Sequence, residues 1–317
     1  MSAVPSDAPD FPSEEEQHHL QRRLFTYSVG ALKAAQQMDR IFVRYPAFVD
    51  IVNACDRCFH LARELDVPNG VLVIGPTGTG KSSVINYFLK TIPPSTLFET
   101  GFGALAVRLQ QRPSVGQVVS AILRKLHYPF ADVSPRSVYI KRDIAFSLLR
   151  EKRCRMIFVD EAYYLLQQMR HRSRDGLDTA VSELLRDLMD DLGIGLVLMA
   201  AGPLDFLERV DPALASRVSV RHSLCNFSLD PVWYGFVTAF CKECTAIDGK
   251  FLTELAIMKH LLFASGGNQR SFKRLATEAA LIAVDAGRTQ LDQPTLALAF
   301  DRVYGKDHGR LNPFVNA

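Results

Sequence analysis

The sequence predicts an α/β fold in which a parallel sheet is flanked by helices and followed by a small C-terminal helical domain. Three short, nearly continuous apolar runs, at 70–75, 156–160 and 195–202, are typical of buried parallel strands. Segments with helical periodicity lie between them, and this alternation predicts helices on both faces of the sheet. Strand signals end after about Pro231, so we expect only helices in the rest of the chain.

Turn residues set the bounds of the expected elements. Pro68-Asn69 precedes the first strand and glycines follow it, and Pro93-Pro94 ends the helix that comes next. Two further strands are expected at 104–109 and 218–222. The expected helices are 20–62 with a break at Tyr45-Pro46, 81–90, 115–126, 138–151, 179–192, 204–210, 232–240, 253–264, 271–286 and 293–304.

The composition is that of a globular protein, and it shows no membrane segment. Of the 317 residues, 48% are hydrophobic and 22% are charged, which is ordinary for a soluble chain with a sizeable core. No apolar run approaches the roughly 18 residues of a spanning helix, and the N-terminus lacks the apolar centre of a signal peptide. We therefore expect a cytoplasmic protein. The formal net charge of +3 permits nucleic-acid binding without arguing for it.

The cysteines favour reduced thiols over a disulfide framework in a chain of this length. Two pairs have C-x-x-C spacing, Cys55/Cys58 and Cys241/Cys244, and together they would supply four zinc ligands. The pairs lie far apart, however, and each falls in a segment where this spacing places both thiols on one helix face. Buried thiols are the favoured interpretation, with a metal site as the alternative.

A glycine-rich loop follows the first predicted strand. Residues 75–82 carry the pattern G-x-x-x-x-G-K-[ST], and a predicted helix follows at once. In such a loop the backbone N–H groups and the helix dipole point at phosphate oxygens. Lys81 adds a cation for the β and γ phosphates, and the Ser82 hydroxyl is a Mg²⁺ ligand. The predicted ATP–Mg²⁺ site comprises Gly75, Pro76, Thr77, Gly78, Thr79, Gly80, Lys81, Ser82 and Ser83.

Two acids follow the predicted strand at 156–160. A phosphate-binding loop of this kind needs a carboxylate for Mg²⁺ at the end of a neighbouring strand, and Asp160 emerges at such an end. We expect Asp160 to bind Mg²⁺ through water, and Glu161, directly after it, to polarise the attacking water as a general base. This order of acids favours hydrolysis over group transfer to a small molecule.

Two arginines complete the predicted site. Arg217 lies at a helix end beyond the strand that ends at Gly202, and Arg270 opens a helix of the C-terminal domain. A guanidinium group is planar, always charged and bidentate. It therefore suits both a contact to the γ phosphate of a neighbouring subunit and a clamp on the nucleotide of its own subunit. Either residue taken alone would be an ordinary surface arginine.

Together these motifs resemble those of an AAA+ ATPase over residues of about 40–290. They comprise the glycine loop, the two acids, Ser216-Arg217 and the Gly-Asn-x-Arg sequence that ends at Arg270. Within that class the chain resembles the TniB/TnsC group of DNA-transposition regulators. The features that carry this resemblance are the lead at 40–48, the sequence Asp160 to Leu166 with the helix and strand after it, and the compact C-terminal helices.

The composition and the resemblance together imply three parts. Residues 1–20 form a disordered tail, residues 21–230 an AAA+ nucleotide-binding domain with an N-terminal helical lead, and residues 231–317 a helical lid with a C-terminal tail. The resemblance also implies that Arg217 acts in trans as an arginine finger, and that Arg270 is the sensor of the lid.

The resemblance further implies that the protein forms rings or filaments around double-stranded DNA in the ATP state. Its implied partners are a DDE-type transposase and a TniQ-like target-selection protein, and hydrolysis would drive disassembly. One departure concerns the strand at 195–202, which ends in Ala200-Ala201-Gly202. Many AAA+ proteins have a polar side chain there that positions the lytic water, so we expect hydrolysis to be slow.

Basic residues recur between the two nucleotide motifs. Arg136, Lys141 and Arg142 follow a loop and begin a helix, a favourable place for phosphate contacts, and Arg112 precedes them. A solvated helical face is the alternative. Without a recognition helix, DNA binding is expected to be independent of sequence. The recurring residues are Arg108, Arg112, Arg124, Lys125, Arg136, Lys141 and Arg142, with a second cluster at 169–174.

Rival functions are weighed by the motifs they need. A replication-type initiator or loader ATPase is expected to carry an added DNA-reading domain, and we expect none after Pro313. A GTPase needs an Asn-Lys-x-Asp motif, which the sequence lacks, and a small-molecule kinase would not explain Arg217. A scaffold that binds ATP without hydrolysing it is the strongest alternative, because of the Ala-Ala-Gly strand end.

Overall fold

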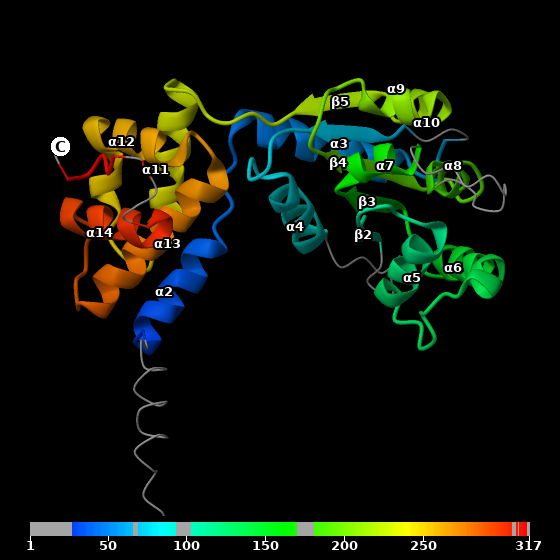
Figure 1. Ribbon diagram of the computed structural model, residues 1–317, viewed down its shortest axis with the longest axis horizontal. Coiled ribbons are helices and arrows are strands. Elements are labelled where there is room, and N and C mark those ends of the chain that lie inside the picture. The colour runs from blue at the N-terminus through cyan, green and yellow to red at the C-terminus, as the bar shows by residue number, and fades with distance from the viewer. Residues whose placement is uncertain are drawn as a thin grey trace, which may run out of the picture.

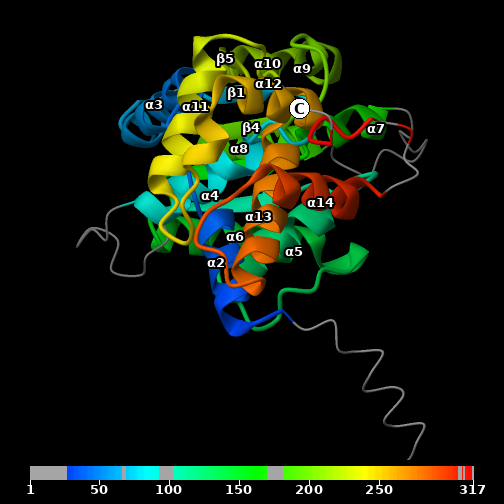
Figure 2. The same ribbon diagram turned by 90° about the vertical axis from the view of Figure 1, so that its left-hand side faces the viewer.

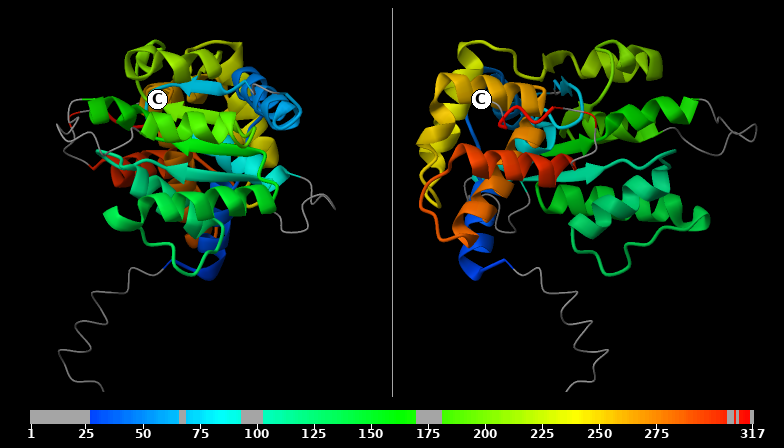
Figure 3. Two further views of the ribbon diagram at one scale, coloured as in Figure 1. Left: turned by 90° about the vertical axis from the view of Figure 1, so that its right-hand side faces the viewer. Right: turned by 60° about the vertical axis from the view of Figure 1, so that its left-hand side comes forward.

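The computed structural model of the chain describes residues 27–65, 69–92, 103–169, 181–305, 309 and 311–315. It consists of two parts that lie side by side, one built around a sheet and one made of helices (Figures 1 and 3). The predicted tail at 1–20 lies outside the described residues, as do residues 170–174 of the second basic cluster.

The sheet contains five strands, all parallel, in the order β2-β3-β4-β1-β5. This confirms the predicted fold class. The sequence predicts the strand before the acids, β3, as the direct neighbour of the strand before the glycine loop, β1. This detail is wrong, because β4 lies between them. The order of strands along a chain does not fix their order in a sheet. The strands are β1 (Val71–Ile74), β2 (Ala104–Arg108), β3 (Met156–Asp160), β4 (Gly195–Ala200) and β5 (Val220–Ser223).

Helices cover both faces of the sheet, and successive strand residues enter opposite cores. Val71 and Val73 belong to the cluster that includes α3 and α4, whereas Leu72 and Ile74 belong to the cluster formed with α5, α6 and α8. All residues of β1 and β4 are therefore buried. The helices here are α3 (Pro46–Leu61), α4 (Lys81–Thr91), α5 (Val115–Lys125), α6 (Val138–Glu151), α7 (Leu165–Met169), α8 (Val181–Asp190), α9 (Phe206–Val210) and α10 (Pro212–Arg217).

The C-terminal helices surround an aromatic core. Trp233, Phe236 and Phe272 are fully buried and contact one another edge-on or stacked. The Trp233 indole N–H donates to the Met258 carbonyl over 2.9 Å, so its polar atom is satisfied. The helices are α11 (Pro231–Glu243), α12 (Leu255–Ser265), α13 (Gln269–Asp285) and α14 (Gln293–Tyr304).

The lead helix α2 (Val29–Asp39) packs along α13 rather than on the sheet (Figures 1 and 2). Its buried residues are Ala31, Ala34 and Met38, and Lys273 of α13 donates to the carbonyls of Asp39 and Ile41 over 2.5 and 3.1 Å. The prediction grouped this segment with the nucleotide-binding domain. In space it belongs with the C-terminal helices, because its apolar face is buried against them.

The C-x-x-C pairs lie in or at the end of packed helices. Cys55 and Cys58 are buried in α3, and burial raises the pKa of Cys58 to about 12. Cys241 lies near the end of α11, and burial raises its pKa to about 12 as well. Within the described ranges, no group of three or more His, Cys, Asp or Glu side chains is placed to hold a metal ion. None of the helices among those residues is long and apolar enough to cross a membrane.

Candidate nucleotide-binding site

The glycine loop connects β1 to α4 at the carboxyl edge of the sheet. Gly78 and Gly80 have φ values of 86° and 103°, in the left-handed region where side chains are strained. A Cβ on Gly75 would collide with the Leu224 carbonyl. The sequence places glycine at these positions because the loop must turn tightly and pack closely. The loop leads directly into α4, whose first backbone N–H groups have no partner within the helix and are available to phosphate oxygens.

Lys81 lies at the mouth of this loop. Its ammonium donates to the carbonyls of Gly75 and Pro76 over 2.5 and 2.9 Å. Burial lowers the pKa of Lys81, and the nearby carboxylates of Glu161 and Asp160 oppose this effect. The lysine is thus a partly desolvated cation beside the loop, on a side chain long enough to reach a phosphate bound there.

Two oxygen ligands suited to Mg²⁺ lie close to Lys81. The Ser82 hydroxyl is 3.3 Å from Asp160 Oδ2, although the two residues come from α4 and β3. A hydroxyl and a carboxylate form the kind of hard oxygen donor set that Mg²⁺ prefers. The residues present therefore fit the ion that the sequence predicts.

Glu161 follows Asp160 in a left-handed conformation with φ of 56°. Its backbone N–H donates to Asp160 Oδ1 over 3.0 Å, which restrains the Asp160 carboxylate. The Glu161 carboxylate accepts a hydrogen bond from Arg108 over 3.2 Å. Arg108 was one of the recurring basic residues of the predicted DNA surface, but its charge is directed at the nucleotide site.

The start of α13 lies directly against the glycine loop. The Asn268 amide donates to the Thr77 carbonyl over 2.9 Å, and the Arg270 backbone N–H donates to the Gly78 carbonyl over 3.0 Å. A Cβ on Gly80 would collide with the Gln269 side chain. The predicted site did not include Asn268 and Gln269, although both stand in the motif that ends at Arg270. Their contacts hold the helical part onto the loop.

A cavity of about 840 Å³ joins these elements. It extends from the loop between α4, α13 and α2, and its wall carries four further basic side chains besides Lys81 and Arg270. These are Arg40, Lys90, Lys273 and Arg274. Ala201, after β4, lines the same cavity. The predicted residues that the structure brings together here are Thr77, Gly78, Gly80, Lys81, Ser82, Ser83, Asp160, Glu161 and Arg270.

Arg217 does not join this group. Its carbonyl accepts a hydrogen bond from Gly70, just before β1, whereas the loop follows β1. The strand between them has four residues, or roughly 13 Å at the usual rise. Arg217 therefore lies at the opposite edge of the sheet from the nucleotide cavity of its own chain.

Of the four predicted DNA contacts, two are exposed and two bond to other parts of the chain. Arg136 is exposed in the 3₁₀ turn before α6, and Arg112 is exposed after β2. Lys141 donates to the Phe130 carbonyl over 2.5 Å and lies above the Tyr128 ring. Arg142, by contrast, forms a half-buried ion pair with Asp187 of α8 at 2.9 Å, so it fastens α6 to the domain.

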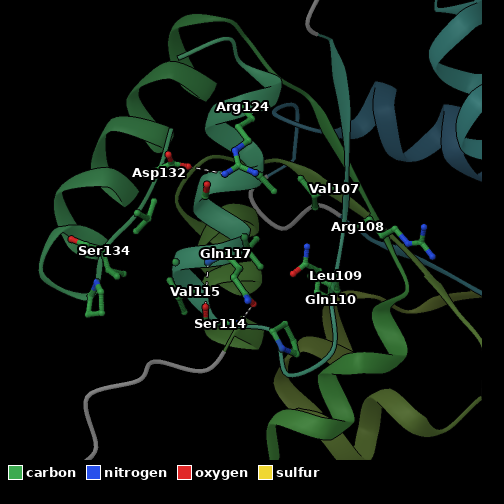
Figure 4. Close-up of a pocket in the computed structure, with 18 of the residues that line it drawn as sticks. Val107, Arg108, Leu109, Gln110, Ser114, Val115, Gln117, Arg124, Asp132 and Ser134 are labelled. Carbon is green, nitrogen blue, oxygen red and sulfur yellow. Dashed lines mark hydrogen bonds and ion pairs between the residues drawn. The ribbon is translucent and has the colours of Figure 1, made fainter. Parts of the chain in front are cut away.

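A second cavity, of about 790 Å³, lies between the end of β2, α5 and residues 132–139 (Figure 4). Ser114 and Gln117 form a capping box at its base, and Arg124 pairs with Asp132 at 2.7 Å across it. In Figure 4 the Arg108 side chain points away from the other lining residues. The register of β2 and β3 sets Arg108 beside Asp160. This position was not predicted from the sequence, although Arg108 stands near the end of the predicted strand at 104–109, as Asp160 does at the end of 156–160.

The five-stranded parallel sheet and the glycine loop give the chain the fold of AAA+ P-loop NTPases. The sequence model of the family described as "Bacterial TniB protein" matches residues 33–225. Because this range is more than half of the chain, the chain belongs to the TniB family, and the predicted group is confirmed. The search of curated proteins found no match.

Solved structures with a similar fold include several ORC proteins. The Aeropyrum pernix ORC2 protein in its ADPNP–ADP complexes aligns with a TM-score of 0.62 and 15% identity, over 87% of this chain and 72% of that one. The Aeropyrum pernix ORC1 protein in complex with DNA gives 0.59 and 19%, over 83% and 66%. Drosophila ORC bound to DNA gives 0.54 and 17%, over 96% and 70%. At these identities the likeness shows the fold alone.

Proposed function

We propose that this protein is an ATP-hydrolysing regulator of DNA transposition, which assembles on duplex DNA and recruits or activates a transposase at the target. The observation that carries the proposal is the convergence of Lys81, Ser82, Asp160, Glu161 and Arg270 on one cavity in a member of the TniB family. A DDE-type transposase and a TniQ-like protein are the partners that membership of this family favours.

Each residue of the cavity has a distinct task in this proposal. Lys81 and the loop N–H groups bind the phosphates of ATP, and Arg270 clamps them from the helical part. Ser82 and Asp160 hold Mg²⁺, which neutralises charge on the phosphate oxygens when it is bound. Glu161 accepts a proton from the attacking water. Arg217 serves the cavity of a second copy, since it lies at the far edge of its own sheet.

Arg108 restrains Glu161 in this scheme. The exposed pair, at 3.2 Å, neutralises the carboxylate and competes with water for it. Exposed pairs contribute up to about 1 kcal/mol, so we expect Arg108→Ala to raise the rate of ATP hydrolysis about two- to five-fold. Steady-state turnover at saturating ATP checks this. Arg124→Ala, which removes an exposed arginine paired with Asp132, is the control and should leave the rate unchanged. A slower Arg108→Ala enzyme would contradict the restraint.

Assembly on DNA is tested by electron microscopy of the protein with duplex DNA and a non-hydrolysable ATP analogue. We expect ordered rings or filaments around DNA with the analogue and none with ADP, because ATP at a shared site joins neighbouring copies. Arg136→Ala combined with Lys141→Ala should weaken binding to duplexes of any sequence and leave ATP binding intact. If no nucleotide state gives an ordered assembly, the transposition proposal fails.

A scaffold that binds ATP without hydrolysing it is the second candidate. It is favoured by Ala201, which lines the cavity where a polar side chain would orient water. We infer slow hydrolysis rather than none, because Glu161 lies in the same cavity and is available as a base. In such a scaffold, bound ATP would stabilise the contact between copies and would not be hydrolysed.

A further inference from the structure

The Arg217 guanidinium is held on two sides by its own chain. Its Nε and Nη2 donate to Oδ1 and Oδ2 of Asp190, each over 2.8 Å, in a bidentate ion pair. Its Nη1 donates to the Ala213 carbonyl, one turn back in α10, also over 2.8 Å. A planar group with three such bonds cannot rotate about its side-chain torsions without breaking one of them.

The pair nevertheless leaves Arg217 able to bind an anion. An arginine carries five N–H donors, and three are used here. One N–H on each terminal nitrogen is thus without a partner in the part of the chain that the structure describes. The side chain is 26% exposed. Two adjacent, fixed donors on a partly exposed cation form the arrangement that binds a phosphate oxygen well.

The helix that carries Arg217 is fixed to the same support. Asp211 caps α10 by accepting from the Ala213 and Leu214 N–H groups over 2.9 and 3.0 Å. The other oxygen of Asp211 is 3.1 Å from Arg186 Nε, and Arg186 lies one turn before Asp190 on α8. Arg186 and Asp190 therefore hold the two ends of α10, and the guanidinium is held by a rigid frame.

We propose that Asp190 is the positioning residue for Arg217, and that the pair presents a pre-oriented guanidinium to the nucleotide of a second copy of this chain. This inference rests on the proposed function, since it needs a site shared between copies. Arg217 lies at the opposite edge of the sheet from its own glycine loop, so only another copy's phosphates can reach it. Without Asp190 the guanidinium samples several rotamers, and few of them meet the phosphate.

The test uses two inactive chains that complement each other. Arg217→Ala keeps the site and lacks the finger, whereas Glu161→Gln keeps the finger and lacks the base. We expect each alone to be inactive and their mixture, with ATP and duplex DNA, to hydrolyse ATP. Adding Asp190→Ala to the Glu161→Gln chain should lower the recovered rate about 10- to 100-fold. Adding it to the Arg217→Ala chain should change nothing, because that chain has no finger to hold.

Further variants separate positioning from a structural role. Asp190→Glu should retain more of the recovered rate than Asp190→Asn, since only a carboxylate accepts both guanidinium bonds. Asp205→Ala in the finger-donating chain is the matched control, because it also removes an exposed carboxylate paired with an arginine, here Arg209 at 2.6 Å. The amount of assembled protein, measured by sedimentation with DNA, should stay the same in all mixtures.

Each other result overturns the proposal. An equal loss from Asp190→Ala in either chain would show a structural role, and a rise would show that Asp190 restrains the finger. An unchanged rate with Asp190→Ala in the finger-donating chain would refute the positioning role and leave the shared site standing. If the unmodified mixture recovers no activity, the shared site itself is refuted, together with the inference.

Discussion

Lys81→Ala is expected to weaken ATP binding by about 10- to 100-fold, because a hydrogen bond to a charged group contributes roughly 1.5–3 kcal/mol. The lysine lies at the glycine loop, with its ammonium 2.5 Å from the Gly75 carbonyl. Binding of a fluorescent ATP analogue, followed by titration of the protein, measures the effect. Lys259→Ala on α12 removes an exposed lysine outside the cavity and should bind like the wild type.

The same substitution should also abolish assembly on DNA at nucleotide concentrations that saturate the wild type. The reason is that the nucleotide, in our proposal, completes the contact between copies. Electron microscopy and sedimentation with duplex DNA follow this directly. Ordered assemblies of the Lys81→Ala protein with its ATP site empty would show that assembly does not depend on ATP. The proposal that ATP controls assembly on DNA would then be refuted.

Glu161→Gln is expected to lower ATP turnover by about 10²- to 10⁴-fold, the usual contribution of a general base. The glutamine keeps the size and shape of the side chain and loses its capacity to take a proton. ATP binding should therefore stay close to that of the wild type, and assemblies on DNA should last longer. Phosphate release and the lifetime of the assemblies are the two measurements, with Glu151→Gln, exposed at the end of α6, as the control.

This variant also separates the two candidate functions. A regulator that hydrolyses ATP loses turnover with Glu161→Gln and gains persistent assemblies. A scaffold that only binds ATP gives the same background rate for both proteins. If the wild type is as inert as Glu161→Gln, the enzyme interpretation is lost and the scaffold stands.

Much of the fold could be predicted from the sequence because the patterns are local. The residues of β1 and β4, and those of β3 up to Asp160, form continuous nonpolar runs, since helices cover both faces of a parallel sheet. The glycine loop could be recognised for a similar reason: Gly78 and Gly80 occupy left-handed conformations that few other residues adopt. Local geometry of this kind leaves a mark on neighbouring residues.

Contacts between distant segments could not be recognised from a local sequence pattern. The lead helix α2 has an apolar stripe that the sequence displays, but nothing in the stripe says that α13 would cover it. Arg108 and Arg142 looked alike as basic residues between two motifs. The structure directs the first to Glu161 and fastens the second to Asp187, because the neighbouring elements differ.

The sequence by itself determined the α/β class, the strands, and the loop at 75–82 with the acids that follow β3, because each depends on residues that are close in the chain. Only the tertiary structure decided that β4 separates β1 from β3, that Asn268 and Gln269 lie against the loop, and that Arg217 is held by Asp190 at the opposite edge. These depend on which elements pack together, and a pairing between two distant segments is fixed by the geometry of the whole fold rather than by the periodicity of either one.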